Sequence, residues 1–239
     1  MKKRIFAMLL CVCMICSLLA ACGGGEKPLP EAHRVIFLPF EKKMSSPANF
    51  KAQRQLAQLM AEEGYDLIIC VGYMLAGATQ EAAKANPDQL FAIIDDATCA
   101  DLPNVACLMF AQEQASYLVG LVAGSVTESK TVGYVQGMVS DSMNLFGIGY
   151  IAGVREACPE AEALQYNANN FGDIAGGNTA AKDMITKGAD VIYHAAGGTG
   201  IGVINTCAEE GIWAIGVDTD QSTLAPDYVI TSAMKRVDV

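Results

Sequence analysis

Short, mostly apolar runs alternate with segments of helical periodicity along this chain, and this alternation constrains its fold more than any other feature. The runs read as strands at 35–38, 66–71, 90–94, 105–110, 131–135, 162–166, 190–194, 213–217 and 228–231. Apolar residues recur at helical spacing over 49–63, 76–86, 114–126, 144–157, 174–187 and 200–210. Continuous apolar strands separated by helices are typical of parallel sheets covered on both faces. The sequence therefore predicts an α/β protein with doubly wound parallel sheets.

A polar stretch at 127–130 divides the alternation into two halves. We therefore expect two lobes, the first over 33–128 and the second over 129–232. Ligands of such sheets bind beyond the carboxyl ends of the strands. The clearest groups at expected strand ends are Asp95, the glycine-rich turn at 197–200 and Asp218.

Charge excludes one class of partner. The 239 residues include 16 Lys and Arg against 26 Asp and Glu, a net charge of −10, whereas nucleic-acid binders normally carry the opposite sign. Two distant histidines, His33 and His194, and no third ligand beside Asp218 and Asp220 argue against a metal site. The turn at 197–202 has neither the dinucleotide nor the P-loop spacing. We expect no metal and no cofactor.

The amino terminus has the pattern of a secretory signal. A basic start at 2–4 and an apolar run at 5–21 end in Leu19-Ala20-Ala21-Cys22-Gly23, which resembles the bacterial lipobox. On this interpretation 1–21 is a signal peptide, Cys22 carries the lipid, with acyl chains such as palmitate, and 22–32 is a tether. The protein is then anchored on the extracytoplasmic face of the cell membrane. The alternative is an ordinary signal peptide with a chance cysteine.

Five further cysteines have no tight spacing: Cys70, Cys99, Cys107, Cys158 and Cys207. An odd number argues against a full disulfide framework, so we expect mostly core thiols. Cys99 and Cys107 are the pair to test first for a disulfide. Trp213, at the start of a strand, is expected in the core.

Several stretches together resemble the basic membrane protein family of ABC-transporter substrate-binding lipoproteins, which includes purine nucleoside receptors. They run through most of the chain, and the last three, in this order, are specific to the family. The stretches are 63–68 (EGYDLI), 91–95 (FAIID), 110–120, 188–192 (GADVI), 194–200 (HAAGGTG), 215–221 (IGVDTDQ) and 231–239 (TSAMKRVDV).

The resemblance implies a type I periplasmic-binding-protein-like fold whose two lobes close on a nucleoside, with a purine expected first. The nucleoside would then pass to an ABC permease and its ATPase. It also implies that 233–239 re-enters the first lobe. Asp95, Phe171, Gly197, Asp218 and Lys235 match positions that line the family's pocket.

The chemistry of these residues suits a nucleoside. A carboxylate such as Asp218 accepts two hydrogen bonds from a ribose diol, and Lys235 can donate to the same oxygens. Phe171 offers a face for a purine, and Asp95 can accept from N–H groups of the base. Which carboxylate serves which part of the ligand is left open by the sequence.

Two departures from the family keep other functions open. Family members open with another strand and helix before His33, and the chain stops at Val239, so we expect a first lobe incomplete at both ends. One alternative is a non-transporting surface lipoprotein or decayed paralogue with the same fold. Another is a secreted nucleoside-processing enzyme, but no Gly-x-Ser-x-Gly motif or paired base is present, so we expect no enzyme.

Overall fold

Four parallel strands form the first sheet of the protein. The computed structural model describes residues 34–39 and 61–236. Within them the first sheet has the order β1 (Val35–Pro39), β2 (Leu67–Val71), β3 (Leu90–Ile94) and β4 (Val105–Leu108). The turn η3 (Tyr73–Leu75) and helix α3 (Ala76–Ala85) follow β2. Leu75 and Ala82 pack with Ile68 and Ile93 in one buried cluster, which explains why β2 and β3 are apolar along their whole length.

Five parallel strands form the second sheet, in the order β6 (Glu162–Asn167), β5 (Thr131–Gln136), β7 (Val191–Ala195), β8 (Trp213–Asp218) and β9 (Val229–Met234). After β5, the next strand in the chain, β6, lies on one side of β5, and the following strand, β7, lies on its other side. The strand order therefore reverses between β5 and β7, and sheets of this kind bind ligands at that point, beyond the carboxyl ends of the strands. The predicted class of doubly wound parallel sheets is confirmed.

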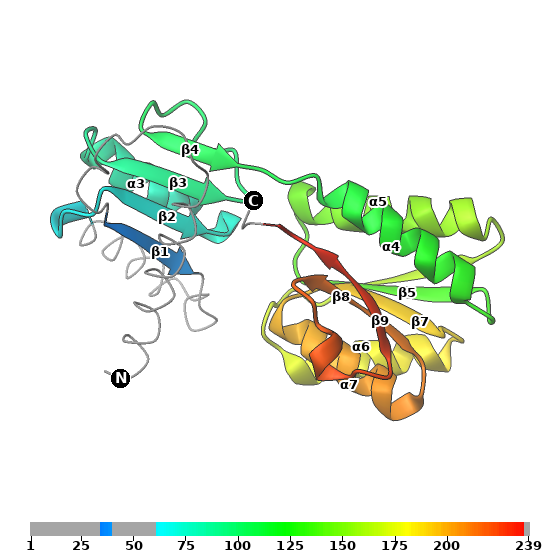
Figure 1. The fold of residues 1–239 in the computed structure, drawn as a ribbon. Helices are drawn as coiled ribbons and strands as arrows, with labels where there is room; N and C mark the ends of the chain where they lie inside the picture. Colours follow the sequence, from blue (N-terminus) through cyan, green and yellow to red (C-terminus); the bar gives the residue numbers. More distant parts are fainter. Residues whose placement is uncertain (1–33, 40–60, 237–239) are drawn as a thin grey trace, which may run out of the picture. The chain divides into compact units, whose positions relative to one another are not determined.

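Two pairs of helices cover opposite faces of the second sheet (Figure 1). The pairs are α4 (Gln112–Val126) with α5 (Asp141–Ala157), and α6 (Ile174–Thr186) with α7 (Gly198–Glu210). Alternate residues of β7 belong to different cores: Tyr193 packs with the first pair and Ile192 with the second. This two-sided burial is the reason that β7 has no polar alternation.

Helix α4 packs with the second sheet, although the sequence analysis assigned 33–128 to the first lobe. Its Val119 and Ala123 share a core with Tyr134 and Tyr193. Lobe boundaries therefore remain a prediction, and this packing favours a division before α4.

Most predicted elements appear within a few residues of their expected limits. Helix α6 begins after Asp173, whose carboxylate accepts a hydrogen bond from Gly176 N at 3.0 Å, and α7 ends at Gly211 with φ 71°. Trp213 is 40% exposed, so its predicted place in the core is wrong; it opens β8 at the rim of the sheet. Cys70, Cys99 and Cys207 are buried free thiols.

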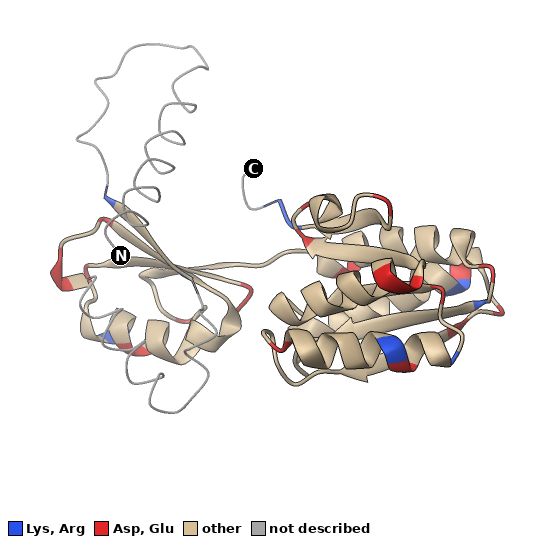
Figure 2. Ribbon diagram, turned by 90° about the horizontal axis from the view of Figure 1, so that it is seen from below, with Lys and Arg blue, Asp and Glu red and all other residues tan. Residues whose placement is uncertain are grey.

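The predicted signal peptide, Cys22 and tether lie outside the described residues, as does most of the helix expected over 49–63. Among the residues that are described, no helix is long and apolar enough to cross a membrane. Acidic residues are spread over helices and loops in the view of Figure 2 and form no single patch there.

Candidate functional site

Two aspartates mark the carboxyl ends of strands that belong to different sheets. Asp95 directly follows β3, and Asp218 is the last residue of β8. Both have left-handed backbones, with φ 66° and 65°. Aspartate tolerates this conformation better than most residues because its short polar side chain can bond locally. Asp95 N donates to Leu108 O at 3.0 Å, so β4 fixes this turn.

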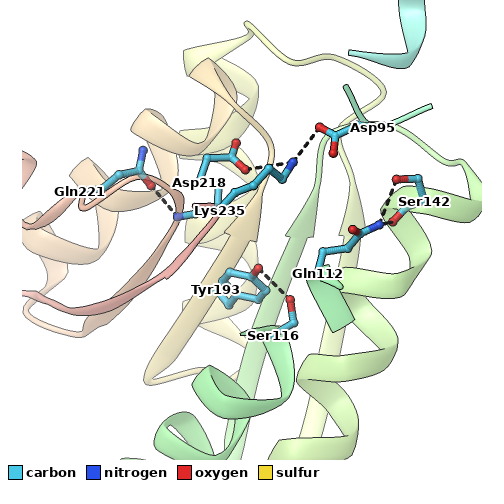
Figure 3. A network of polar contacts seen from close by, with 9 residues as sticks. Asp95, Gln112, Ser116, Ser142, Tyr193, Asp218, Gln221 and Lys235 are labelled. Carbon is cyan, nitrogen blue, oxygen red and sulfur yellow. Dashed lines mark hydrogen bonds and ion pairs between the residues drawn. The ribbon is translucent and has the colours of Figure 1, made fainter. Parts of the chain in front are cut away.

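Hydrogen bonds also fix the end of β8. Gln221 Oε1 accepts from Val217 N at 2.8 Å, immediately before Asp218 (Figure 3). Asp218 O in turn accepts from Lys235 N at 2.9 Å, beyond the end of β9. The backbones of Asp218 and Lys235 therefore hold one another in place.

The ammonium group of Lys235 joins the two aspartates. Its Nζ lies 2.7 Å from Asp95 Oδ2 and 3.6 Å from Asp218 Oδ1, and Figure 3 shows the three side chains converging. The Lys235 side chain is only 13% exposed, whereas the Asp218 carboxylate is 53% exposed. Two carboxylates around one cation leave this group with one negative charge in excess.

Two aromatic rings flank the same ammonium group. The centroids of the Phe110 and Phe146 rings lie 5.6 and 5.7 Å from Lys235 Nζ. Their π-faces attract a cation, which adds to the attraction of the carboxylates. Neither phenylalanine was predicted as a site residue.

A cavity of about 150 Å³ lies against these groups and collects all five predicted site residues. It is lined by Gly72, Tyr73, Met74, Asp95, Ser142, Met143, Phe146, Phe171, Ala195, Gly197, Val217, Asp218 and Lys235. Side chains far apart in the sequence thus face one space. Their role in binding a ligand remains a prediction.

The Phe171 ring is seated where the strand order of the second sheet reverses. It packs on Gly137, just after β5, where an added side chain would collide with the ring, and beside Gly197, just after β7, where an added Cβ would lie 3.1 Å from Phe171 O. Gly197 also has φ 53°, which disfavours any side chain. The Tyr73 ring meets Phe171 edge to face, with centroids 6.5 Å apart and planes at 66°. Burial raises the pKa of Tyr73.

Sequence reasoning missed the lining residues that follow β2 and those that open α5. Gly72 and Tyr73 come directly after β2, and Ser142 and Phe146 lie in the first turns of α5. The rule that ligands gather at strand carboxyl ends could have found the first pair. No motif marked the second pair, whose position depends on how α5 packs.

A second cavity of about 180 Å³ shares Phe146 and Lys235 with the first. Phe110, Ala111 and Gln112, which lead from β4 into α4, form one wall of it. Gln112 Nε2 donates to Ser142 O at 3.2 Å and to Ser142 Oγ at 3.1 Å. This links the start of α4 to a residue that lines the first cavity.

In the part of the chain that the structure describes, no group of three or more His, Cys, Asp or Glu side chains is arranged to hold a metal ion. Asp95 and Asp218 both pair with the ammonium group of Lys235.

Parallel doubly wound sheets with a cavity at their strand ends are typical of the type I periplasmic-binding fold. A solved solute-binding protein of an ABC transporter system from Aeropyrum pernix K1 has this fold. It matches with a TM-score of 0.75 and 30% identity, over 80% of this chain and 57% of that one.

The sequence comparisons identify the family. The family described as ABC transporter substrate-binding protein PnrA-like matches residues 40–239. A CD4+ T-cell-stimulating antigen of Listeria monocytogenes is 37% identical over 82% of this chain and 58% of the relative. The ABC transporter nucleoside-binding protein BmpA of Lactococcus lactis subsp. cremoris is 36% identical over 74% of this chain and 55% of the relative. This chain belongs to the PnrA-like family of ABC transporter substrate-binding proteins, and it spans between half and two thirds of the length of these relatives.

Proposed function

We propose that this protein binds a nucleoside in the cavity beside Lys235 and presents it to the permease and ATPase of an ABC importer. One observation carries the proposal: all five residues expected from the family pattern line a single cavity. Membership of the substrate-binding family and the nucleoside-binding relative in Lactococcus lactis support it.

Each lining group has a part in this proposal. The exposed carboxylate of Asp218 accepts hydrogen bonds from the ribose diol, and the Lys235 ammonium donates to the same oxygens. The purine lies against the Phe171 ring, where stacking contributes about 1–3 kcal/mol. Asp95 accepts from N–H groups once Lys235 Nζ moves from it toward the ribose.

The charges in the cavity favour a ligand without formal charge. Lys235 is already matched by two carboxylates, so a phosphate would meet an excess of negative charge. A nucleoside is therefore preferred over the corresponding nucleotide.

The size of the cavity implies a rearrangement on binding. About 150 Å³ is less than the roughly 300–1,000 Å³ of most small-molecule sites. Lys235 and Phe146 line both cavities, so movement of the Lys235 side chain changes the space available in each. The same movement brings the ammonium group to the ligand.

Titration calorimetry on the full-length chain in detergent tests the proposal with adenosine, guanosine, inosine, uridine and adenosine monophosphate. We expect at least one nucleoside to bind, and the monophosphate to bind more weakly. Asp218→Asn should weaken binding by roughly 10- to 100-fold, because it removes an ionised acceptor. Asp183→Asn is the matched control, since Asp183 pairs with Lys187 on the exposed surface of α6.

Two results would contradict the proposal. One is the absence of heat and of a thermal shift with all four nucleosides. The other is release of a free base during incubation, detected by chromatography, which would indicate a nucleoside-processing enzyme instead.

We also propose that the protein is held on the extracytoplasmic face of the membrane by lipid on Cys22. The lipobox-like sequence ending at Cys22 supports this proposal.

A further inference from the structure

Thr199, in the first turn of α7, bonds one surface loop through its hydroxyl and its backbone N–H, and the N–H also donates to Ala196 O at 3.1 Å. Its side chain is fully buried. Thr199 Oγ1 donates to Asn170 O at 2.8 Å and accepts from Asp173 N at 2.8 Å, and Thr199 N donates to Phe171 O at 3.3 Å. A residue of one helix thus holds three neighbouring backbone positions of the loop between β6 and α6.

This loop carries the Phe171 ring into the cavity. Asn170 N donates to Gly137 O at 2.8 Å, which ties the loop to the end of β5. Thr199 supplies the attachment on the other side, at the end of β7. Phe171 is therefore held from both strands that border the point where the sheet order reverses.

Threonine suits this position because its hydroxyl both donates and accepts while its methyl group fills the space beside α6. Valine has nearly the same shape but can do neither. It would leave Asn170 O and Asp173 N without these partly buried hydrogen bonds, and the loop would lose its attachment.

We infer that Thr199 is a positioning residue for the binding site: it fixes the Phe171 ring in the orientation that a nucleobase stacks against. The inference rests on the proposed function for its ligand. A ring that is already fixed loses little conformational freedom when the ligand binds, so the attachment improves affinity without contact to the ligand.

Calorimetry with the tightest-binding nucleoside separates this role from a general loss of stability. We expect Thr199→Val to weaken binding about three- to tenfold, the effect of freeing one or two side chains. Thr199→Ser keeps the hydroxyl and should restore affinity. Thr206→Val is the matched control, because Thr206 is equally buried in α7 but its hydroxyl bonds Asn178 Oδ1 at 3.3 Å, away from the loop.

A double-mutant cycle tests whether Thr199 acts through Phe171. In a Phe171→Leu background, Thr199→Val should cause no further loss of affinity, because the ring that it positions is gone. If the two losses simply multiply, Thr199 acts independently of Phe171 and the inference is wrong.

A measurement without ligand keeps the inference testable if no nucleoside binds and the proposed function fails. In protein labelled with 4-fluorophenylalanine, the fluorine resonance of Phe171 is assigned by its absence in Phe171→Leu. It should shift or broaden in Thr199→Val and stay at the wild-type position in Thr199→Ser and Thr206→Val. An unchanged resonance in a folded Thr199→Val protein overturns the inference. If Thr199→Val does not unfold cooperatively, Thr199→Ala is measured in its place.

Discussion

The ammonium group of Lys235 is surrounded by more negative charge than it can neutralise. Its Nζ lies 2.7 Å from Asp95 and 3.6 Å from Asp218. The faces of two phenylalanine rings also lie close to it. The positive charge of Lys235 therefore needs no anionic ligand to balance it. Its excess carboxylate oxygens instead offer acceptors, which suits a ligand rich in O–H and N–H groups.

Also at the scale of single residues, the buried side chain of His194 makes the stability of the protein depend on pH. It is fully buried in β7, and burial lowers its pKa to about 4, with the nearby Gln221 side chain opposing only part of that shift. The unfolded chain takes up a proton near pH 6.5, whereas the folded protein does so only near pH 4. The stability that His194 provides is thus complete above pH 6.5 and is lost as the pH falls from 6.5 to 4.

Urea unfolding between pH 4.5 and 7.5 tests this prediction. The wild-type free energy of unfolding should fall on acidification, and His194 should account for up to about 3 kcal/mol of the fall. In His194→Gln that part should disappear, so the difference between the two curves isolates it from titrating carboxylates. Parallel curves would show that His194 does not titrate in this way.

At the scale of elements, α4 and α5 are joined by direct contact of their backbones. A side chain on Gly153 would collide with Tyr117 O, Leu121 N and the Gly120 backbone. This close approach buries Val119 and Ala123 against the second sheet, in the cluster that also contains Phe146. The position of a cavity residue therefore depends on glycines one or two turns away.

We predict that Gly153→Ala destabilises the protein by about 1–3 kcal/mol, because the helices must separate. The added methyl group outweighs the roughly 1 kcal/mol by which alanine normally improves a helix over glycine. Gly77→Ala in α3 is the control, since no atom lies within 4 Å of the added carbon, and it should stabilise slightly. Denaturant midpoints measure both; equal effects of the two substitutions would contradict the predicted contact.

At the scale of the whole molecule, the apolar runs were sufficient to predict the sheets. Strand β3 is buried from Phe91 to Ile94, on both faces of the sheet, so its apolar pattern can be read from the local sequence alone. The assignment of α4 was not accessible in this way, because helical spacing shows that a helix has an apolar face but not which sheet it covers. Phe146 was missed for the same reason: only the packing of α5 brings it to the cavity.

The proposed attachment to the membrane concerns the location of the whole molecule. We predict that Cys22→Ser abolishes incorporation of an alkyne-labelled palmitate and moves the protein from the detergent phase to the aqueous phase. The reason is that stable anchoring requires acyl chains, and an acidic protein is not attracted to an anionic membrane surface. Cys158→Ser is the matched control, because Cys158 is a partly buried thiol at the end of α5. Equal labelling of both variants would place the lipid elsewhere.

The left-handed backbones of Asp95 and Asp218 restrict how this site can change over evolutionary time. Asparagine accepts the same conformation, so the charge at either position can be removed without disturbing the turn. Glutamate would retain the charge but strains the backbone, and its longer side chain would displace Lys235. New ligand preferences at these two positions are therefore reached most easily by loss of charge, with the geometry of the strand ends preserved.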